Sequence, residues 1–123
     1  MLLTRFLDRF GSTDTTDAED LHRRLAHLHG TTPICRIAPR QEVTVGGVVV
    51  ALTRSVPQDS PRLDITVSDG TGAARARFLG MRAIPGITAG RTVVLTGCFT
   101  THSDAPSLMA LNPRYELIGS LAD

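Results

Sequence analysis

The stretch from 63 to 79 constrains the fold most, because its pattern predicts a β-hairpin. In its first half apolar residues alternate with polar ones, which is the period of two expected of a half-buried strand. The segment 69–72, Asp-Gly-Thr-Gly, predicts a tight turn, since Asp and Gly tolerate the positive φ values that a hairpin connection needs. In the second half the alternation puts Arg75 and Arg77 on one face. The predicted hairpin is apolar inside and basic outside.

This hairpin supplies two of five predicted strands. Their expected ranges are 42–55, 63–68, 73–79, 91–101 and 107–117. Gly46 and Gly47 interrupt the first strand and allow the bend that a strand shared by two halves of a small barrel needs. The segment 80–90 allows a helical turn, although Pro85 and Gly86 argue against a long helix. The residues expected to face inward are Val45, Leu63, Ile65, Val67, Ala76, Phe78, Val93, Leu95 and Phe99.

Two short helical patterns precede the first strand. The first runs from 3 to 10, and the second begins with a capping-box arrangement of Thr16 and Glu19. The apolar stripe of the second pattern consists of Leu21, Leu25 and Leu28. Helices this short are not stable alone, so they must dock on the sheet, on each other or on a second copy of the chain. We therefore expect a helical N-terminal extension over 1–35 and a barrel domain over 36–123.

The composition favours one domain with a modest core, since 41% of the 123 residues are hydrophobic. No apolar run approaches the ~18 residues of a membrane span. Asp8 and Arg9 break the apolar segment that a signal peptide would need. Cys35 and Cys98 form neither a disulfide framework nor a metal-binding spacing, and we expect Cys98 to be a small buried residue. The sequence thus predicts a reduced, cytoplasmic protein with no membrane partner.

Charge is unevenly distributed along the chain. The formal net charge is +1, but nine arginines and six acidic residues give the region 36–119 a net charge of +3. All the basic residues are Arg, whose planar fork suits phosphate and stacks on bases. The absence of Lys also fits a GC-rich genome, so the arginines alone do not decide between nucleic-acid binding and codon usage.

Five strands, a bent first strand and an insertion between the third and fourth describe an oligonucleotide/oligosaccharide-binding (OB) barrel. Five motifs carry the resemblance: Gln41-Glu-Val-Thr-Val-Gly-Gly47, Ser68-Asp-Gly-Thr-Gly72, Ala76-Arg-Phe-Leu79, Gly90-Arg-Thr-Val-Val-Leu-Thr-Gly97 and Asn112-Pro-Arg-Tyr-Glu116. They resemble the nucleic-acid-binding OB family, in particular the wedge domain of RecG-type branch-migration helicases. They are also similar to small bacterial proteins that pair this barrel with a short helical N-terminus. Such motifs specify a fold well and a ligand poorly.

The resemblance implies a binding face on the second and third strands, flanked by the loops after the first and fourth strands. Carried onto this sequence, the candidate nucleic-acid-binding residues are Arg54, Arg62, Thr66, Arg75, Arg77, Arg82, His102 and Arg114. Arg75 and Arg77 point the same way at roughly 6–7 Å spacing, which is near the phosphate separation along one strand of nucleic acid. The alternative is that these residues form an ordinary solvated face.

The candidate binding face has no predicted aromatic side chain on which bases could stack. Exposed aromatics each contribute ~1–3 kcal/mol in single-strand binders, but this chain has no Trp, one Tyr and four Phe. Phe78 and Phe99 are expected inside, and Tyr115 is expected to be a packed strand-end residue. Binding to single-stranded or branched DNA, rather than RNA, should therefore be weak and strongly dependent on salt.

The sequence gives no sign of an enzyme, a cofactor or a metal site. His27 and His29 lie two residues apart in a helical pattern and so point to different sides. Asp69 is interpreted as a turn former. The alternative function is a protein-interaction OB module acting as a subunit or homodimer. It is suggested by 48–50, Val-Val-Val, which would make both faces of the first strand apolar.

Overall fold

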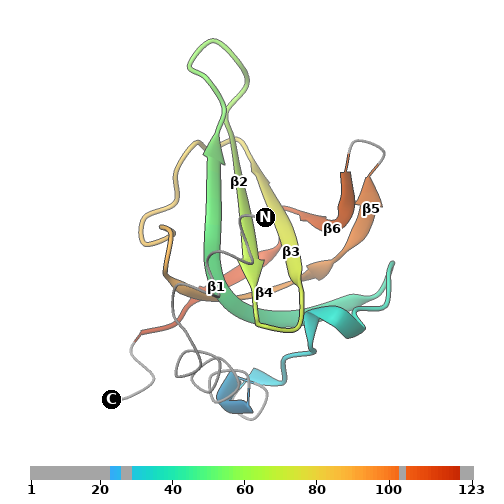
Figure 1. Cartoon of the computed structure of the whole chain (residues 1–123). Coiled ribbons are helices and arrows are strands. Elements are labelled where there is room, and N and C mark those ends of the chain that lie inside the picture. The colour runs from blue at the N-terminus through green and yellow to red at the C-terminus, as the bar shows by residue number, and fades with distance from the viewer. Residues whose placement is uncertain (1–22, 26–28, 103–104, 120–123) are drawn as a thin grey trace.

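The computed structural model of the chain describes residues 23–25, 29–102 and 105–119, and side chains within these ranges except those of 102, 105 and 106. These residues are mainly β (Figure 1). The elements are the 3-10 helix η1 (Ile34–Arg36) and the strands β1 (Glu42–Arg54), β2 (Arg62–Ser68), β3 (Ala73–Leu79), β4 (Thr92–Cys98), β5 (Thr100–His102), β6 (Ala105–Leu111) and β7 (Arg114–Leu117). All the strands belong to one sheet with the order β5-β6-β3-β2-β1-β4-β7.

The central hairpin is formed by β2 and β3 in the register expected from its sequence. Ser68 pairs with Ala73, and Asp64 pairs with Arg77. All nine residues predicted to face inward are buried, with at most 4% of each residue exposed. They belong to a single core cluster, so the predicted register is confirmed.

The prediction of five strands is wrong in number, because the last two predicted strands are each divided. Phe99 separates β4 from β5 and is buried in the core. Between β6 and β7 lie Asn112, whose φ is +47°, and Pro113, which has no backbone N–H to donate. In the observed order, β5 and β7 are the two ends of the sheet, so the sheet is not closed, whereas a closed or nearly closed five-stranded barrel was expected.

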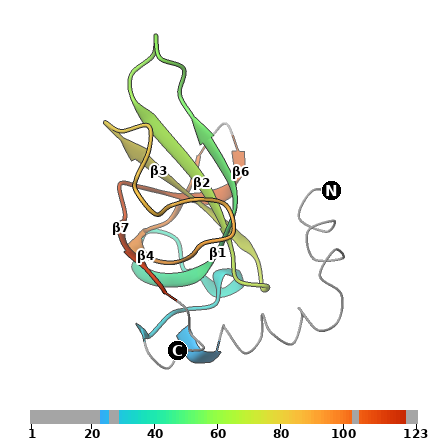
Figure 2. The same ribbon diagram turned by 90° about the vertical axis from the view of Figure 1, so that its left-hand side faces the viewer.

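Strand β1 is long and curved, and it serves two neighbours (Figures 1 and 2). Residues 42–48 pair with β4, and residues 48–54 pair with β2. Gly47 lies at the crossover because a Cβ there would come within 2.3 Å of the backbone oxygen of Ser68. Close approach of two backbones is therefore the reason for glycine at this bend.

The segment between β3 and β4 has no helix and closes the core with side chains instead. Ile84 and Ile87 are both buried in the main cluster. The Ile87 N–H donates to the Ile84 carbonyl oxygen at 3.0 Å, which makes a tight turn around Pro85 and Gly86. The helical turn that the sequence allowed is absent from this described segment.

Leu25 docks the helical segment 23–25 on the outside of the sheet. Residues 23–25 are helical, and Leu25 is buried against Val94 and Ile118. A Cβ on Gly46 would lie 2.8 Å from Leu25 Cδ1, so the glycine makes room for the leucine. The prediction that this leucine packs on the sheet is confirmed, whereas the helix over 3–10, Leu21 and Leu28 lie outside the described residues.

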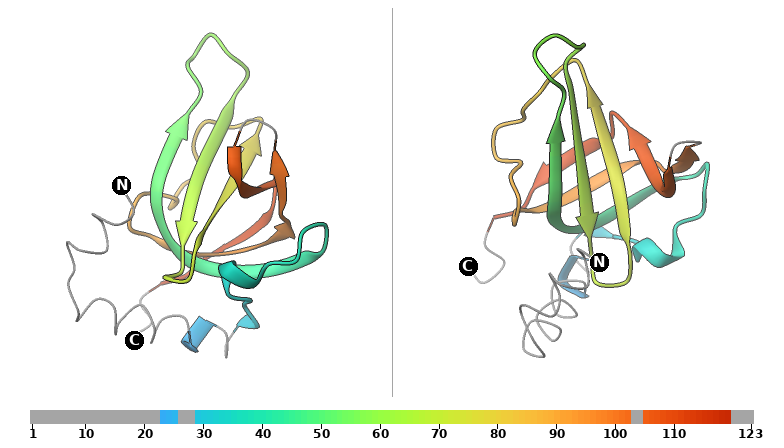
Figure 3. Two further views of the ribbon diagram at one scale, coloured as in Figure 1. Left: turned by 45° about the vertical axis from the view of Figure 1, so that its right-hand side comes forward. Right: turned by 45° about the horizontal axis from the view of Figure 1, so that its top comes forward.

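Asp69 fastens η1 to the β2–β3 turn. The two views of Figure 3 show η1 lying beside this turn. Its Oδ1 accepts hydrogen bonds from the N–H and hydroxyl of Thr71 and from the N–H of Gly72. Its Oδ2 accepts one from the N–H of Ile34 at 2.9 Å. The interpretation of Asp69 as a turn former is correct, and the same carboxylate also anchors a segment 35 residues away.

Cys98 corrects another expectation, because it is exposed rather than buried. Strand β4 turns Val93 and Leu95 inward, and the alternation therefore turns Cys98 outward.

Replacing Asp69 by Asn should lower the free energy of unfolding by about 1–3 kcal/mol. Both carboxylate oxygens of Asp69 accept hydrogen bonds. The Asn side chain has one oxygen and one NH₂ group, so in either orientation the NH₂ group faces a donor, and that buried donor loses its acceptor. Chemical denaturation of Asp69→Asn beside the exposed control Asp59→Asn measures this. Equal stability of the two variants would contradict the anchoring role.

Replacing Leu25 by Ala should cost about 2–4 kcal/mol, because it removes a buried side chain and leaves a cavity over Gly46. The matched control is Val56→Ala, since Val56 is an apolar residue that is 53% exposed. Thermal unfolding followed by circular dichroism measures both variants. If Leu25→Ala melts no earlier than Val56→Ala, the docking contributes nothing to stability.

Candidate nucleic-acid interface

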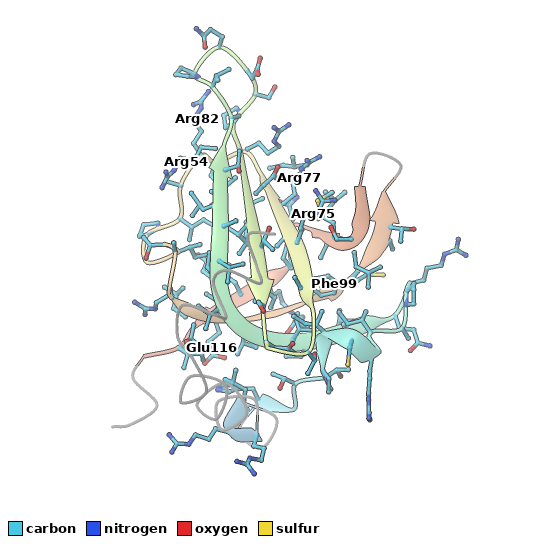
Figure 4. All side chains as sticks on the ribbon, in the orientation of Figure 1. Arg54, Arg75, Arg77, Arg82, Phe99 and Glu116 are labelled. Carbon is cyan, nitrogen blue, oxygen red and sulfur yellow. The ribbon has the colours of Figure 1, made fainter. Side chains whose placement is uncertain are left out.

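The outer face of β2 and β3 gathers charged and polar side chains in two cross-strand rows. In one row Thr66 of β2 lies beside Arg75 of β3. In the next row Asp64 of β2 lies beside Arg77 of β3. Residues at alternate positions are buried in the core, so this face is set by the pleat of the two strands. Figure 4 shows Arg75 and Arg77 extending from β3 on the side where β6 lies.

Arg77 is held by a bidentate ion pair with Asp64. Its Nε donates to Oδ1 at 2.9 Å, and its Nη2 donates to Oδ2 at 3.2 Å. Arg62 approaches the same carboxylate, with its Nε 3.5 Å from Oδ2. Asp64 therefore neutralises part of the basic face. The formal net charge of Arg62, Arg75, Arg77 and Asp64 together is +2.

Arg75 lies in a different environment from Arg77. Its Nε and Nη2 are shielded from solvent and have no hydrogen-bond partner in the structure. The residues directly beside it in the sheet are Thr66 on β2 and Met109 on β6. Neither residue carries a charge that could pair with the guanidinium.

Arg82 has its guanidinium engaged by the backbone of the β1–β2 loop. Its Nη2 donates to the carbonyl oxygens of Val56, Pro57 and Asp59 at 2.9–3.4 Å. These contacts fasten the loop that flanks the outer face. Arg54, at the end of β1, lies opposite the core residue Leu63 on β2. It therefore belongs to the same face of the sheet as Leu63 and not to the outer face that carries Arg75 and Arg77. In Figure 4 both arginines lie beside β1 and its loop, away from Arg75 and Arg77.

The remaining two predicted binding residues lie elsewhere. Arg114, on β7, pairs with Glu42 at 3.2 Å, and both side chains are well exposed. His102 ends β5, and its side chain lies outside what the structure describes. The structure thus brings together Arg62, Thr66, Arg75 and Arg77 on one face. Arg54, Arg82 and Arg114 lie outside this group.

Two features of this face were missed by the sequence analysis. The first is the role of Asp64, although the hairpin register already places it opposite Arg77. The second is a pair of exposed leucines beside Arg77. Leu111 lies directly across on β6, Leu79 follows two residues later on β3, and about half of each is exposed. The alternation that puts Arg75 and Arg77 on the outer face already puts Leu79 there, but it gives no sign that Leu111 lies beside them.

Tyr115 and the triple-valine segment belong to strands other than β2 and β3, namely β7 and β1. Tyr115 is 45% exposed on β7, and its ring meets Phe78 edge-on with centroids 5.8 Å apart. Within 48–50, Val49 belongs to the core, and Val48 and Val50 are half-buried. The segment therefore does not present an open apolar surface.

Solved structures share this arrangement of strands. RecG bound to a three-way DNA junction superposes with a TM-score of 0.58 over 74% of this chain, at 16% identity. The OB domain of MM0293 from Methanosarcina mazei superposes with a TM-score of 0.55 over 73% of this chain and 84% of that one, at 14% identity. The chain has an OB fold. The resemblance of the sequence motifs to the OB family, including the likeness to RecG, is thus confirmed, whereas the closed five-stranded barrel is not.

The OB fold also matches a complete small binding protein. The OBody AM3L09 bound to hen egg-white lysozyme superposes with a TM-score of 0.53 over 72% of this chain and 93% of its own length, at 18% identity. By contrast, the chain spans only 13% of the length of RecG. Neither a protein-family model nor a curated protein matches the sequence of this OB fold.

Two negative observations apply to the part of this OB fold that the structure describes. No helix there combines the length and apolar character needed to cross a membrane. Among the same residues, His, Cys, Asp and Glu side chains form no group that could hold a metal ion.

Removal of the Asp64 carboxylate should cost about 1–3 kcal/mol of stability. The Asp64–Arg77 pair is only about one fifth exposed, so its loss lies between the costs for surface pairs and for buried pairs. The matched control is Glu42→Ala, which breaks the exposed Arg114 pair and should cost less than about 0.5 kcal/mol. Urea denaturation of Asp64→Ala and Glu42→Ala tests this difference, and equal losses would contradict it.

Proposed function

We propose that this OB domain is a non-enzymatic nucleic-acid-binding module that contacts backbone phosphates through the outer face of β2 and β3. The observation that carries the proposal is the pair of shielded, unpartnered nitrogens of Arg75 on a face with a net charge of +2. Arg62 lies two residues beyond Asp64 on the same face of β2, with its side chain 43% exposed. Phosphate is the abundant anion that a linear array of such groups suits.

Single-stranded or branched DNA is the proposed ligand, in preference to RNA. Support for this choice comes from the likeness to RecG, whose structure contains a three-way DNA junction. We also propose that the seven strands act as the five of an OB barrel, with β4 and β5 as one strand and β6 and β7 as another. The cytoplasm, where nucleic acid is accessible in a bacterium, is the proposed location.

The affinity should be modest because the face lacks aromatic platforms. Phe78 and Phe99 are buried in the core, and Tyr115 lies on β7 rather than on β2 or β3. Without base stacking, the free energy of binding comes from phosphate contacts and counterion release. We therefore expect dissociation constants in the micromolar range or weaker at physiological salt, which is typical of non-specific binding.

A protein-interaction module is the second candidate function, as a subunit or homodimer. It is favoured by the exposed apolar residues Leu79, Met81 and Leu111, which flank the basic face or follow it in the chain. An OB protein bound to lysozyme is among the similar structures, and protein binding is thus compatible with this architecture. The segment 48–50 remains part of this alternative, although its half-buried valines leave little apolar surface for a partner.

The proposed function predicts that the double variant Arg62→Gln/Arg75→Gln loses two phosphate contacts. Its slope of log K against log salt should fall by roughly 1.4 on a single strand, because each contact contributes about 0.7. The measurement is fluorescence anisotropy with single-stranded, forked and duplex DNA and with RNA, from ~50 mM salt upwards. This double variant leaves the Arg77–Asp64 pair intact.

The control is Arg36→Gln, which removes one exposed charge from η1, outside the β2–β3 face. It should retain the parent slope. If the parent protein binds none of the nucleic acids at low salt, the proposal of nucleic-acid binding is wrong. If the double variant keeps the parent slope, the module binds nucleic acid through another surface.

A further inference from the structure

Arg75 and Arg77 present the same edge of the guanidinium to different environments. In Arg77 the Nε–Nη2 edge is filled by the carboxylate of Asp64, in the side-on geometry that matches two oxygens of one anion. In Arg75 the same two atoms are shielded and have no partner. Arg82 and Arg91 each have a shielded Nε without a partner, but among the described arginines only Arg75 has both atoms of an edge in this state.

An unpaired edge of this kind is unfavourable in the free protein. A donor taken out of water without an acceptor loses its hydration, and the loss is larger for a charged group. Rotation of the Arg75 side chain outward would exchange two unpaired N–H groups for two charge-assisted hydrogen bonds to an anion. An arginine that is already exposed and hydrated, such as Arg62, gains less from the same contact.

Asp64 is the one carboxylate that the hairpin places near Arg75. It lies diagonally across from Arg75, two positions from Thr66 along β2, at a separation that long side chains can span. The bidentate bond from Arg77 keeps both oxygens of Asp64 engaged. Without Arg77 the Asp64 carboxylate would keep only the Arg62 contact at 3.5 Å, and its Oδ1 would be free to pair with Arg75.

We infer that Arg75 is the bidentate phosphodiester-binding residue of this face, and that Arg77 is a positioning residue that holds Asp64 away from it. This inference rests on the proposed nucleic-acid-binding function. It assigns different roles to two arginines that the sequence pattern alone does not distinguish. Binding moves the Nε–Nη2 edge of Arg75 from its shielded position onto two phosphate oxygens. Arg77 makes no phosphate contact.

Charge-matched variants test the role of Arg75. Lys preserves the charge but cannot form a fork, so Arg75→Lys should bind a dT oligomer of ~12 nucleotides at least fivefold more weakly than the parent. Arg36→Lys, the charge-matched control at an exposed arginine of η1 outside this face, should change the affinity by less than twofold. Equal weakening by the two substitutions would overturn the assignment to Arg75.

A rescue experiment tests the role of Arg77. Arg77→Gln should weaken binding severalfold, because it frees Asp64 to capture Arg75. Arg77→Gln/Asp64→Asn should restore both the affinity and the salt slope of the parent. If Arg77 were itself a phosphate contact, the slope of this double variant would stay lower by about 0.7. That lower slope would overturn the positioning role.

A readout that does not depend on affinity follows the two guanidinium groups directly. In ¹⁵N-labelled protein the Arg75 Nε–H resonance should shift as the dT oligomer is added, and the Arg77 Nε–H resonance should stay in place. Arg75→Met should also raise the melting temperature by several degrees, since it removes the unpaired buried donors, whereas Arg77→Met should lower it. A shift of Arg77 alone, or a lower melting temperature for Arg75→Met, would contradict the inference.

Failure of this inference is distinguishable from failure of the proposed function. If the parent binds neither the dT oligomer nor forked DNA, duplex DNA or RNA at ~50 mM salt, both are wrong. If the parent binds and the Lys variants, the rescue or the resonances behave contrary to expectation, nucleic-acid binding stands and the division between Arg75 and Arg77 does not.

Discussion

The register of the β2–β3 hairpin is the constraint on which the core and the candidate face both depend. It is fixed at the turn by the Asp69 carboxylate, which binds the turn backbone and η1 together. A slip of either strand by one residue would bring all the apolar side chains of that strand to the surface. The same register places Asp64 opposite Arg77 and Thr66 opposite Arg75. Folding and the charge pattern of the outer face therefore have a common origin in this turn.

Much of the fold could be predicted because strand alternation is a local property. Every residue of β2 and β3 that the alternation predicted to face inward is buried. The OB fold followed from the order of strands and turns. The division of the last strands was harder to foresee, although Asn112-Pro113 is a strong turn signal. For Cys98 the alternation and the residue type led to opposite predictions. The alternation that put Leu95 and Phe99 inside also put Cys98 outside, and residue type was wrongly preferred over the pattern.

The site was only partly predictable, because side-chain pairing depends on contacts between distant segments. The pair of Arg77 with Asp64 could have been derived from the hairpin register. The engagement of Arg82 could not, since it requires the fold of the β1–β2 loop over a segment 23–26 residues later. Nor could the sequence show that both nitrogens on one edge of Arg75 are shielded from solvent and lack a hydrogen-bond partner. Counting arginines overstated the number available to a ligand.

The distribution of partners, rather than the number of charges, gives this face its character. Arg77, Arg82 and Arg114 each have a described acceptor, and these contacts serve the hairpin, the β1–β2 loop and the β1–β7 contact respectively. Such arginines stabilise a scaffold, and withdrawing them for a ligand would cost the bonds they already make. Arg75 has no such bonds at its Nε–Nη2 edge to lose. On a nearly neutral protein, a ligand contact is therefore most favourable where the fold has left a guanidinium group without an acceptor.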